Sequence, residues 1–195
     1  MCHMLETRDD TIQLVKLAQA GNMEAFTILV QNYEHEIYGY LSGLLGDQDE
    51  AYDFAQQVFI KAWLNLAGLR EASYFKTWLY TIARNLTCDY WRRKKILYQS
   101  WESIEMSNIT DGMHEPEDQV VNAELVNLAL AELSLNLRHC LLLKVVGGFP
   151  PHEIARIVGI NQSSVNTYVS TARRLFRAAY QRLANEQEIG VQVDV

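Results

Sequence analysis

Residues 150–175, PPHEIARIVGINQSSVNTYVSTARRL, contain the pattern that decides the fold of the chain. Two prolines open a short helical segment that ends at Gly159, and a second helical segment begins a few residues later. We expect a hydroxyl cap at Ser163 or Ser164 and a final long helix over residues 165–184. A short helix, a tight turn and a second helix together predict a helix–turn–helix.

The exposed side of the second helix has the chemistry of a DNA-reading surface. Small hydroxyls and amides near its start suit hydrogen bonds to base edges, and the arginines that follow suit phosphates. Residues 133–185 hold seven Lys or Arg and one acid, Glu153, whereas a generic helical corner needs no such positive charge. The candidate contacts to duplex DNA are Ser163, Ser164, Asn166, Thr167, Ser170, Thr171, Arg173 and Arg174.

The rest of the chain also shows helical periodicity. Apolar residues recur three or four positions apart after Gly21 as far as Leu44, and again from Asp49 to Leu66. Glycine and proline are sparse, at 10 and 3 residues, which favours helices over turn-rich sheets. We therefore expect an all-α protein with two small helical domains.

Charge is strongly segregated along the chain. The formal net charge is −7, yet residues 96–132 hold eight acids and no Lys or Arg. Ser, Asn, Asp, Gly and Pro interrupt any helical period there. We expect an acidic flexible linker at 96–120 between a first domain at 11–95 and a second domain at 121–185, with a tail at 186–195.

Residues 73–95, SYFKTWLYTIARNLTCDYWRRKK, combine six aromatic side chains with six cations. Rings that stack on bases at about 1–3 kcal/mol each, with cations for the phosphates, are typical of a single-stranded nucleic-acid surface. An amphipathic helix with an aromatic core and a cationic end has the same composition. In that second interpretation the buried stripe is Phe75, Trp78, Leu79, Ile82, Leu86 and Tyr90, and the other side carries Lys76, Tyr80, Arg84 and Trp91.

Three segments together are similar to a known family: DEAYDFAQQVFIKAW (49–63), FKTWLYTIARNLTCDYWRRKK (75–95) and EIARIVGINQSSVNTYVSTARR (153–174). In order and spacing they resemble regions two and four of the extracytoplasmic-function (ECF) sigma factors of the sigma-70 superfamily. The resemblance covers roughly residues 11–184. It implies a cytoplasmic factor that binds bacterial core RNA polymerase and directs initiation at specific promoters.

The resemblance also assigns roles to residues. Asp53, Gln56, Gln57 and Phe59 match the helix that docks on the clamp helices of the largest polymerase subunit. The loop 69–74 and Asn85 match the pocket for a flipped base of the minus-ten element, for which the candidate residues are Arg70, Ser73, Tyr74, Tyr80, Arg84, Asn85, Arg92 and Arg93. Residues 163–174 match the helix that enters the minus-thirty-five major groove.

The remaining implications concern the linker, a partner and the departures from the pattern. The acidic linker matches the segment that passes toward the RNA exit channel, although a solvated tether has the same composition. An anti-sigma partner is implied, and no residue identifies it. Asn166, Tyr168 and Thr171 stand where basic residues are common in the family, which predicts weaker minus-thirty-five binding.

Other functions find little support in the sequence. HEIAR is not HExxH, no phosphate loop is present, and the adjacent Cys2 and His3 lack partner ligands. We expect no catalytic residues, no metal site and no cofactor, and we expect His139 and Cys140 to pack in an apolar helix. Scattered cysteines and short apolar runs predict a reducing, cytoplasmic location and no membrane insertion. The alternatives are a dimeric helix–turn–helix regulator that acts without polymerase, and a helical interaction module without DNA activity.

Overall fold

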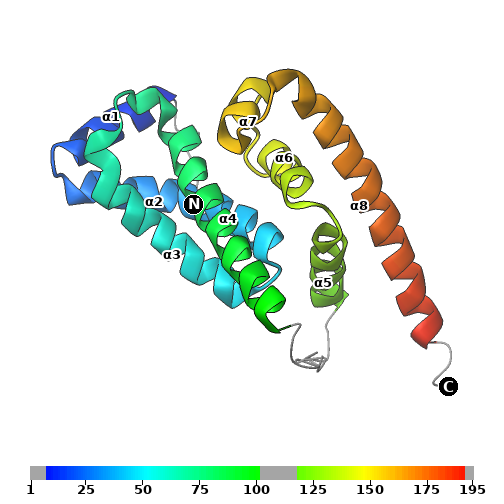
Figure 1. Ribbon diagram of the computed structural model, residues 1–195. Coiled ribbons are helices and arrows are strands. Elements are labelled where there is room, and N and C mark those ends of the chain that lie inside the picture. Colours follow the sequence, from blue (N-terminus) through cyan, green and yellow to red (C-terminus); the bar gives the residue numbers. More distant parts are fainter. Residues whose placement is uncertain (1–7, 102–117, 192–195) are drawn as a thin grey trace.

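The structure, a computed structural model, describes residues 8–101 and 118–191. Every regular element in these two ranges is helical and none is a strand, which confirms the all-α prediction. The elements are α1 (Arg8–Gln19), α2 (Met23–Leu45), α3 (Gln48–Asn65), η1 (Leu66–Gly68), η2 (Ala72–Tyr74), α4 (Phe75–Trp101), α5 (Asp118–Ala131), α6 (Leu135–Val145), α7 (Pro151–Val158) and α8 (Gln162–Val191) (Figure 1).

Helices α1–α4 form the first domain, and local cap chemistry sets the ends of α2 and α3. The side chain of Asn22 accepts a hydrogen bond from the backbone N–H of Ala25, which starts α2. Gly46 ends α2 with φ of 77°, a left-handed conformation that glycine adopts at little cost. Asp47 then caps α3, which confirms the break expected between the periodic segments that end at Leu44 and begin at Asp49.

Helix α1 was not predicted, and it holds the connection between α3 and α4 in place. The amide of Gln19 donates hydrogen bonds to the carbonyls of Leu66 at 3.0 Å and Leu69 at 2.7 Å. The stretch predicted as a loop after Gly68 therefore contains the compact 3-10 turn η2.

Helices α5–α8 form the second domain, which contains the predicted helix–turn–helix. Proline occupies the first position of α7, and Gly159 ends that helix with φ of 74°. Helix α8 begins at Gln162, so Ser163 and Ser164 lie inside its first turn and do not cap it. The turn therefore ends earlier in the chain than predicted. The N–H of Ser164 donates a hydrogen bond to the carbonyl of Asn161 at 3.0 Å. Helix α8 also runs beyond residue 184 to Val191.

The predicted linker is shortened at both ends by helix. Helix α4 continues to Trp101 and α5 begins at Asp118. Residues 102–117, which carry most of the predicted linker, lie outside the described residues, as do Cys2 and His3. No helix within the described ranges is both long enough and apolar enough to cross a bilayer.

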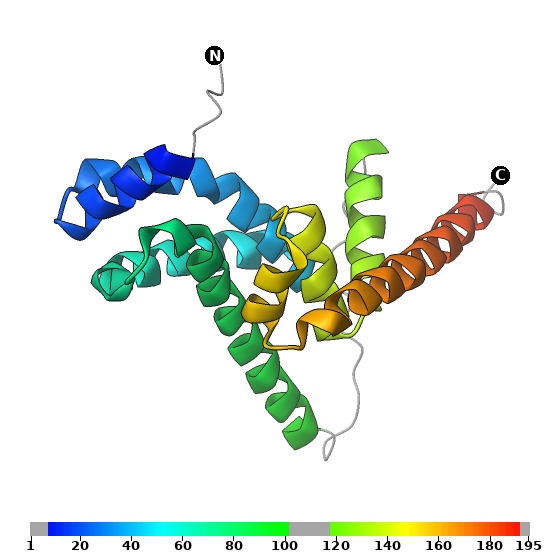
Figure 2. The same cartoon turned by 90° about the horizontal axis from the view of Figure 1, so that it is seen from above.

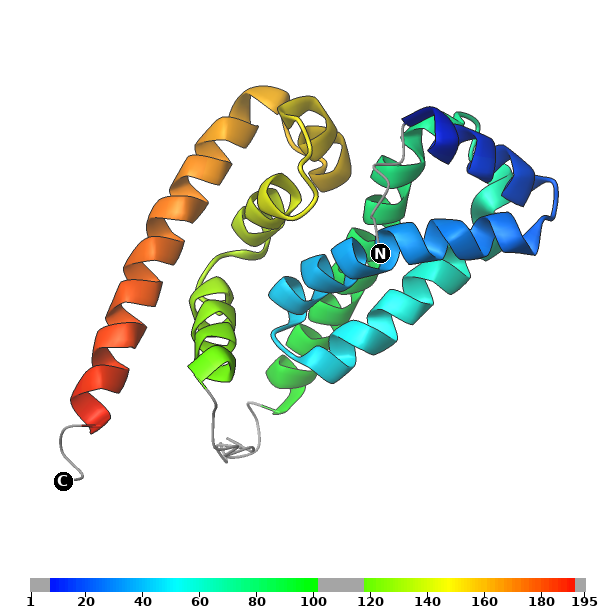
Figure 3. The same cartoon turned by 180° about the vertical axis from the view of Figure 1, so that it is seen from behind.

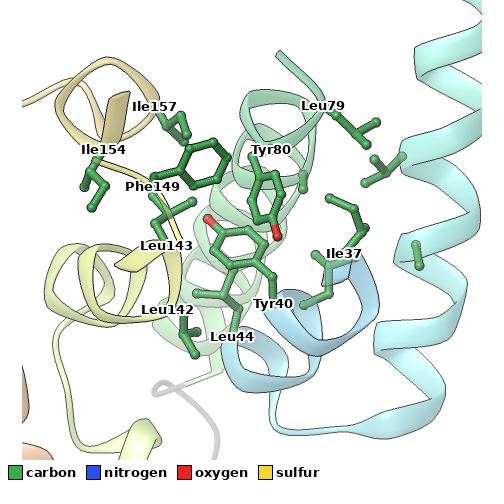
Figure 4. Close-up of a cluster of buried hydrophobic side chains, with 14 of the residues drawn as sticks. Ile37, Tyr40, Leu44, Leu79, Tyr80, Leu142, Leu143, Phe149, Ile154 and Ile157 are labelled. Atoms are coloured by element: carbon green, nitrogen blue, oxygen red, sulfur yellow. The ribbon is translucent and has the colours of Figure 1, made fainter. Parts of the chain in front are cut away.

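The two domains lie side by side and share one hydrophobic core, while the C-terminal part of α8 projects away from the rest (Figures 2 and 3). Helix α4 packs against α7, and α2 packs against α5 and α6. Tyr40 and Tyr80 of the first domain meet Leu143 and Phe149 of the second in a continuous cluster (Figure 4). The chain is therefore a closed pair of domains.

This closure corrects the prediction for α4. Phe75 and Leu79 are fully buried as expected, but Tyr80 is fully buried too, although it was placed on the other side of the helix. The reason is that the second domain covers that side: the Tyr80 and Phe149 rings meet edge-to-face with centroids 4.8 Å apart. His139 and Cys140 are fully buried, which confirms that they pack.

Candidate nucleic-acid interface

A positively charged groove follows one face of α8. Asn166, Ser170, Arg173, Arg177 and Gln181 recur every three or four positions, so they share this face. Lys144 of α6 stands across from them, and Val169, Arg174 and Ala178 complete the lining. The groove thus has four cations and no acid among its lining residues.

The residues predicted to contact the minus-thirty-five element are accessible. Ser163, Asn166, Thr167, Ser170, Arg173 and Arg174 are exposed, and Ser164 and Thr171 are half-buried. Arg173, Arg174 and Arg177 have no carboxylate within 4.0 Å among the described residues. Their guanidinium groups are therefore available to an external anion.

A smaller polar groove surrounds Asn85, which is exposed on α4. Its other lining residues are Lys61 and Asn65 from α3 and Trp78, Ile82, Leu86 and Asp89 from α4. An aromatic ring, two amides and a lysine around one hollow suit a single base, because the ring can stack and the amides can pair with a base edge.

The structure does not bring the 69–74 loop into the Asn85 groove. Ser73 lines a different hollow, which includes Glu153 of α7. Arg70 is exposed, and the ring of Tyr74 lies 4.7 Å beneath the guanidinium of Arg156, also from α7. The predicted base pocket is thus divided in the closed molecule, with Asn85 on one side and Ser73 and Tyr74 on the other.

Two further minus-ten candidates are held by the second domain. Arg84 donates to the carbonyl of Val158, the last residue of α7, at 2.9 Å, and Tyr80 is buried as described above. Arg92 and Arg93 are exposed near the end of α4. Arg92 pairs with Asp89 at 3.1 Å, and Arg93 donates to the Asp89 carbonyl at 3.3 Å.

The predicted polymerase-docking helix is α3, and it borders an apolar groove with α2. Asp53, Gln56 and Gln57 are exposed, and Phe59 is buried in the groove wall. The groove is lined by Val30, Glu34, His35, Tyr38, Tyr52, Ala55, Gln56, Phe59 and Ile60. Tyr52 and Ile60 are 60% and 58% exposed, so large apolar side chains remain unpartnered beside the predicted residues.

Sequence reasoning missed several residues of these grooves. Arg177 could have been found, because it lies four positions after Arg173 on the same helical face. Lys61 and Asn65 carried no signal, since only the packing of α3 on α4 brings them to Asn85.

Comparison with known families matches both domains. Residues 29–96 match the family described as Sigma-70 region 2, and residues 123–176 match Sigma-70, region 4. The ECF RNA polymerase sigma factor SigW of Bacillus subtilis is 33% identical over 174 residues, which cover 84% of this chain and 92% of that protein. The chain belongs to the ECF sigma factors.

Another curated relative and two solved structures are also similar to this chain. The RNA polymerase sigma-H factor of Pseudomonas aeruginosa is 30% identical and covers 92% of this chain and 98% of its own length. The structure of CnrH, solved in complex with the cytosolic domain of CnrY, has a TM-score of 0.71 at 20% identity, covering 89% of this chain and 99% of that chain.

A third comparison is with the sigma factor RpoE of Bartonella quintana, solved in complex with the anti-sigma factor NepR. It has a TM-score of 0.67 at 22% identity and covers 82% of this chain and 98% of that chain. These two structures share the fold. Family membership decides the function class in favour of a transcription-initiation factor over a dimeric repressor or an interaction module.

Proposed function

We propose that this sigma factor docks on core RNA polymerase through the α2–α3 groove, captures a minus-ten base beside Asn85, and reads the minus-thirty-five element with α8. The observation that carries the proposal is the row of cations in the α8 groove, because none of them has a carboxylate partner among the described residues. In this proposal the chain captures a DNA strand and positions it, and it carries out no covalent step. We place it in the cytoplasm, where bacterial core polymerase is found.

The Asn85 groove explains how a flipped base could be held. Extruding a base costs a few kcal/mol, and stacking on Trp78 with hydrogen bonds from Asn65 and Asn85 would offset that cost. The solved complex of the Bartonella quintana relative with an anti-sigma factor supports an anti-sigma partner for this chain as well.

Replacing Asn85 with alanine tests the base pocket. In run-off transcription with core polymerase on a promoter library, Asn85→Ala is expected to lower specific transcripts on the order of tenfold or more, because a base edge loses its partner. The variant is also expected to discriminate less between the preferred minus-ten base and its replacements.

Gln48→Ala is the matched control, since Gln48 is an exposed amide on α3 outside the groove. Full activity of Asn85→Ala, with unchanged discrimination at every minus-ten position, would remove Asn85 from the pocket. Silence of the wild-type chain with core polymerase would reject the proposed function as a whole.

Replacing Ile60 with glutamate tests the docking groove. A charge on this half-exposed apolar residue would have to be desolvated on docking, so affinity for core polymerase is expected to fall at least about tenfold. Leu64→Glu is the matched control, because Leu64 is 73% exposed on the same helix but does not line the groove. Equal losses for the two variants in a core-binding titration would contradict docking at this groove.

A further inference from the structure

The boundary between the two domains is built like a protein interior. The Tyr40 and Tyr80 rings of the first domain lie with centroids 5.0 Å apart, and Phe149 of the second domain packs on Tyr80 (Figure 4). All three side chains are at most 3% exposed. A loosely tethered second domain would leave these rings in water, so the boundary is a specific closed contact.

A buried histidine lies at the centre of this boundary. Nδ1 of His139 on α6 is 2.7 Å from the hydroxyl of Tyr40 on α2, and its Nε2 is 3.7 Å from Sγ of Cys88 on α4. Burial lowers the pKa of His139 to about 3, helped by Arg84 and Arg138, so the ring is neutral at neutral pH. A neutral imidazole has one donor and one acceptor nitrogen, which matches a hydroxyl on one side and a thiol on the other.

Arg138 ties the backbones of the two domains together. Its guanidinium is buried and donates to the carbonyl of Leu44 in the last turn of α2 at 3.0 Å. It also donates to the carbonyls of Ala131 at 2.7 Å and Leu133 at 3.3 Å in its own domain. Carbonyls at helix C-termini lack partners within the helix and carry partial negative charge, so one cation satisfies two helix ends at once.

The same contact occupies residues assigned to minus-ten DNA. Arg84 donates to Val158, Tyr74 lies beneath Arg156, and Tyr80 is buried. A strand of DNA that used these side chains would have to displace α7.

The closed molecule is also too small to span a promoter. The names of the two elements place them about 25 base pairs apart, or about 85 Å along the duplex. In the closed molecule the reading helix α8 begins only four residues after Val158, whose carbonyl accepts a hydrogen bond from Arg84 at 2.9 Å, and residues 163–174 extend over about 18 Å of helix. The domains must therefore separate before each reaches its own element.

We propose that Tyr40, Cys88, Arg138 and His139 form a latch that holds the free sigma factor closed and masks part of its minus-ten surface until the domains open. This proposal rests on the proposed function, because it concerns access to the same DNA surface. In this closed form the chain cannot bind both promoter elements at the same time.

Gly43 offers a way to open the latch without touching the DNA surfaces. A Cβ added at Gly43 on α2 would lie 2.8 Å from Cδ2 of Leu142 and 3.3 Å from Cδ1 of Leu130, both in the second domain. The three heavy atoms nearest to that Cβ all belong to the second domain, so we expect this position on α2 to be hydrated once the domains separate. Gly43→Glu therefore places a bulky charged side chain in the domain boundary, which destabilises the closed form, whereas the open form can hydrate the charge. The substitution also replaces a helical glycine with a better helix former.

Small-angle X-ray scattering of the free full chain is the first measurement. The wild type is expected to give the radius of gyration of the closed molecule, and Gly43→Glu is expected to be larger by several ångströms with unchanged helical circular dichroism. Gly39→Ala is the matched control, because a Cβ there meets only Val146 at an ordinary 3.7 Å. Leu142→Glu introduces the charge from the other side and guards against a folding defect specific to position 43.

The second measurement is binding of the free chain to a labelled single strand that carries a minus-ten sequence. Opening is expected to raise the affinity about tenfold for Gly43→Glu, if the closed form is favoured about tenfold, and to leave Gly39→Ala unchanged. An expanded wild type, or opened variants that bind the strand no better, would overturn the latch. Because scattering needs no polymerase, a failure of transcription by all variants would count against the proposed function alone.

Discussion

Neutralising Arg173 and Arg177 together is expected to lower the affinity of the holoenzyme for promoter DNA on the order of a hundredfold. Each guanidinium stands in the α8 groove without an acidic partner among the described residues. We estimate that each lost phosphate contact costs on the order of tenfold. Because phosphates carry no sequence information, the loss is expected to be nearly uniform across promoters.

The experiment compares Arg173→Gln, Arg177→Gln and the double variant in promoter-binding titrations with core polymerase. Arg182→Gln is the matched control, because Arg182 lies on the same helix but pairs with Glu132, the residue after α5, and does not line the groove. A double variant that binds as tightly as Arg182→Gln would show that DNA does not follow this face of α8.

Acidification is expected to open the closed molecule. The pKa of His139 is lowered to about 3 in the closed form, whereas a hydrated imidazole titrates near pH 6.5. The open form alone takes up a proton below pH 6.5, so closure is fully favoured above that pH and is lost progressively as the pH falls toward 3. At pH 5 the closed form is expected to be disfavoured about 30-fold relative to pH 8.

The groups that face His139 do not reverse this sign. Burial raises the pKa of Tyr40 and of Cys88, so both stay protonated in this range, and Arg84 and Arg138 only oppose a charged imidazole. The measurement is the radius of gyration between pH 8 and 5, with His139→Asn as the control, since its amide oxygen can accept from Tyr40 but does not titrate. A wild type as insensitive to pH as His139→Asn would show that the ring is already hydrated.

The fold could be predicted where the signals are local. Asn22, Gly46, Asp47 and Gly159 set helix ends through their own side chains and backbone, and each is visible in the sequence. The predicted start of α8 was a few residues too late, because the turn at Asn161 closes through backbone groups that any residue supplies.

The candidate site was predictable only along single helices. The row on α8 follows from helical spacing, but the groove around Asn85 needs Lys61 and Asn65 from another helix. Tyr80 was misplaced because its partner, Phe149, lies 69 positions further along the chain. Sequence periodicity predicts which side of a helix is apolar, but it does not predict whether another domain covers the opposite side.

The way in which cations contact the opposite domain determines how the closed form responds to ionic strength. Among the described residues no salt bridge joins the two domains. Arg84 and Arg138 contact carbonyls, and Lys76 and Arg156 lie over the rings of Phe149 and Tyr74. Added salt screens attraction between exposed charges far more than buried hydrogen bonds and apolar contacts. Concentrated salt is therefore expected to weaken DNA binding without opening the free protein, so DNA binding and domain opening can be measured separately.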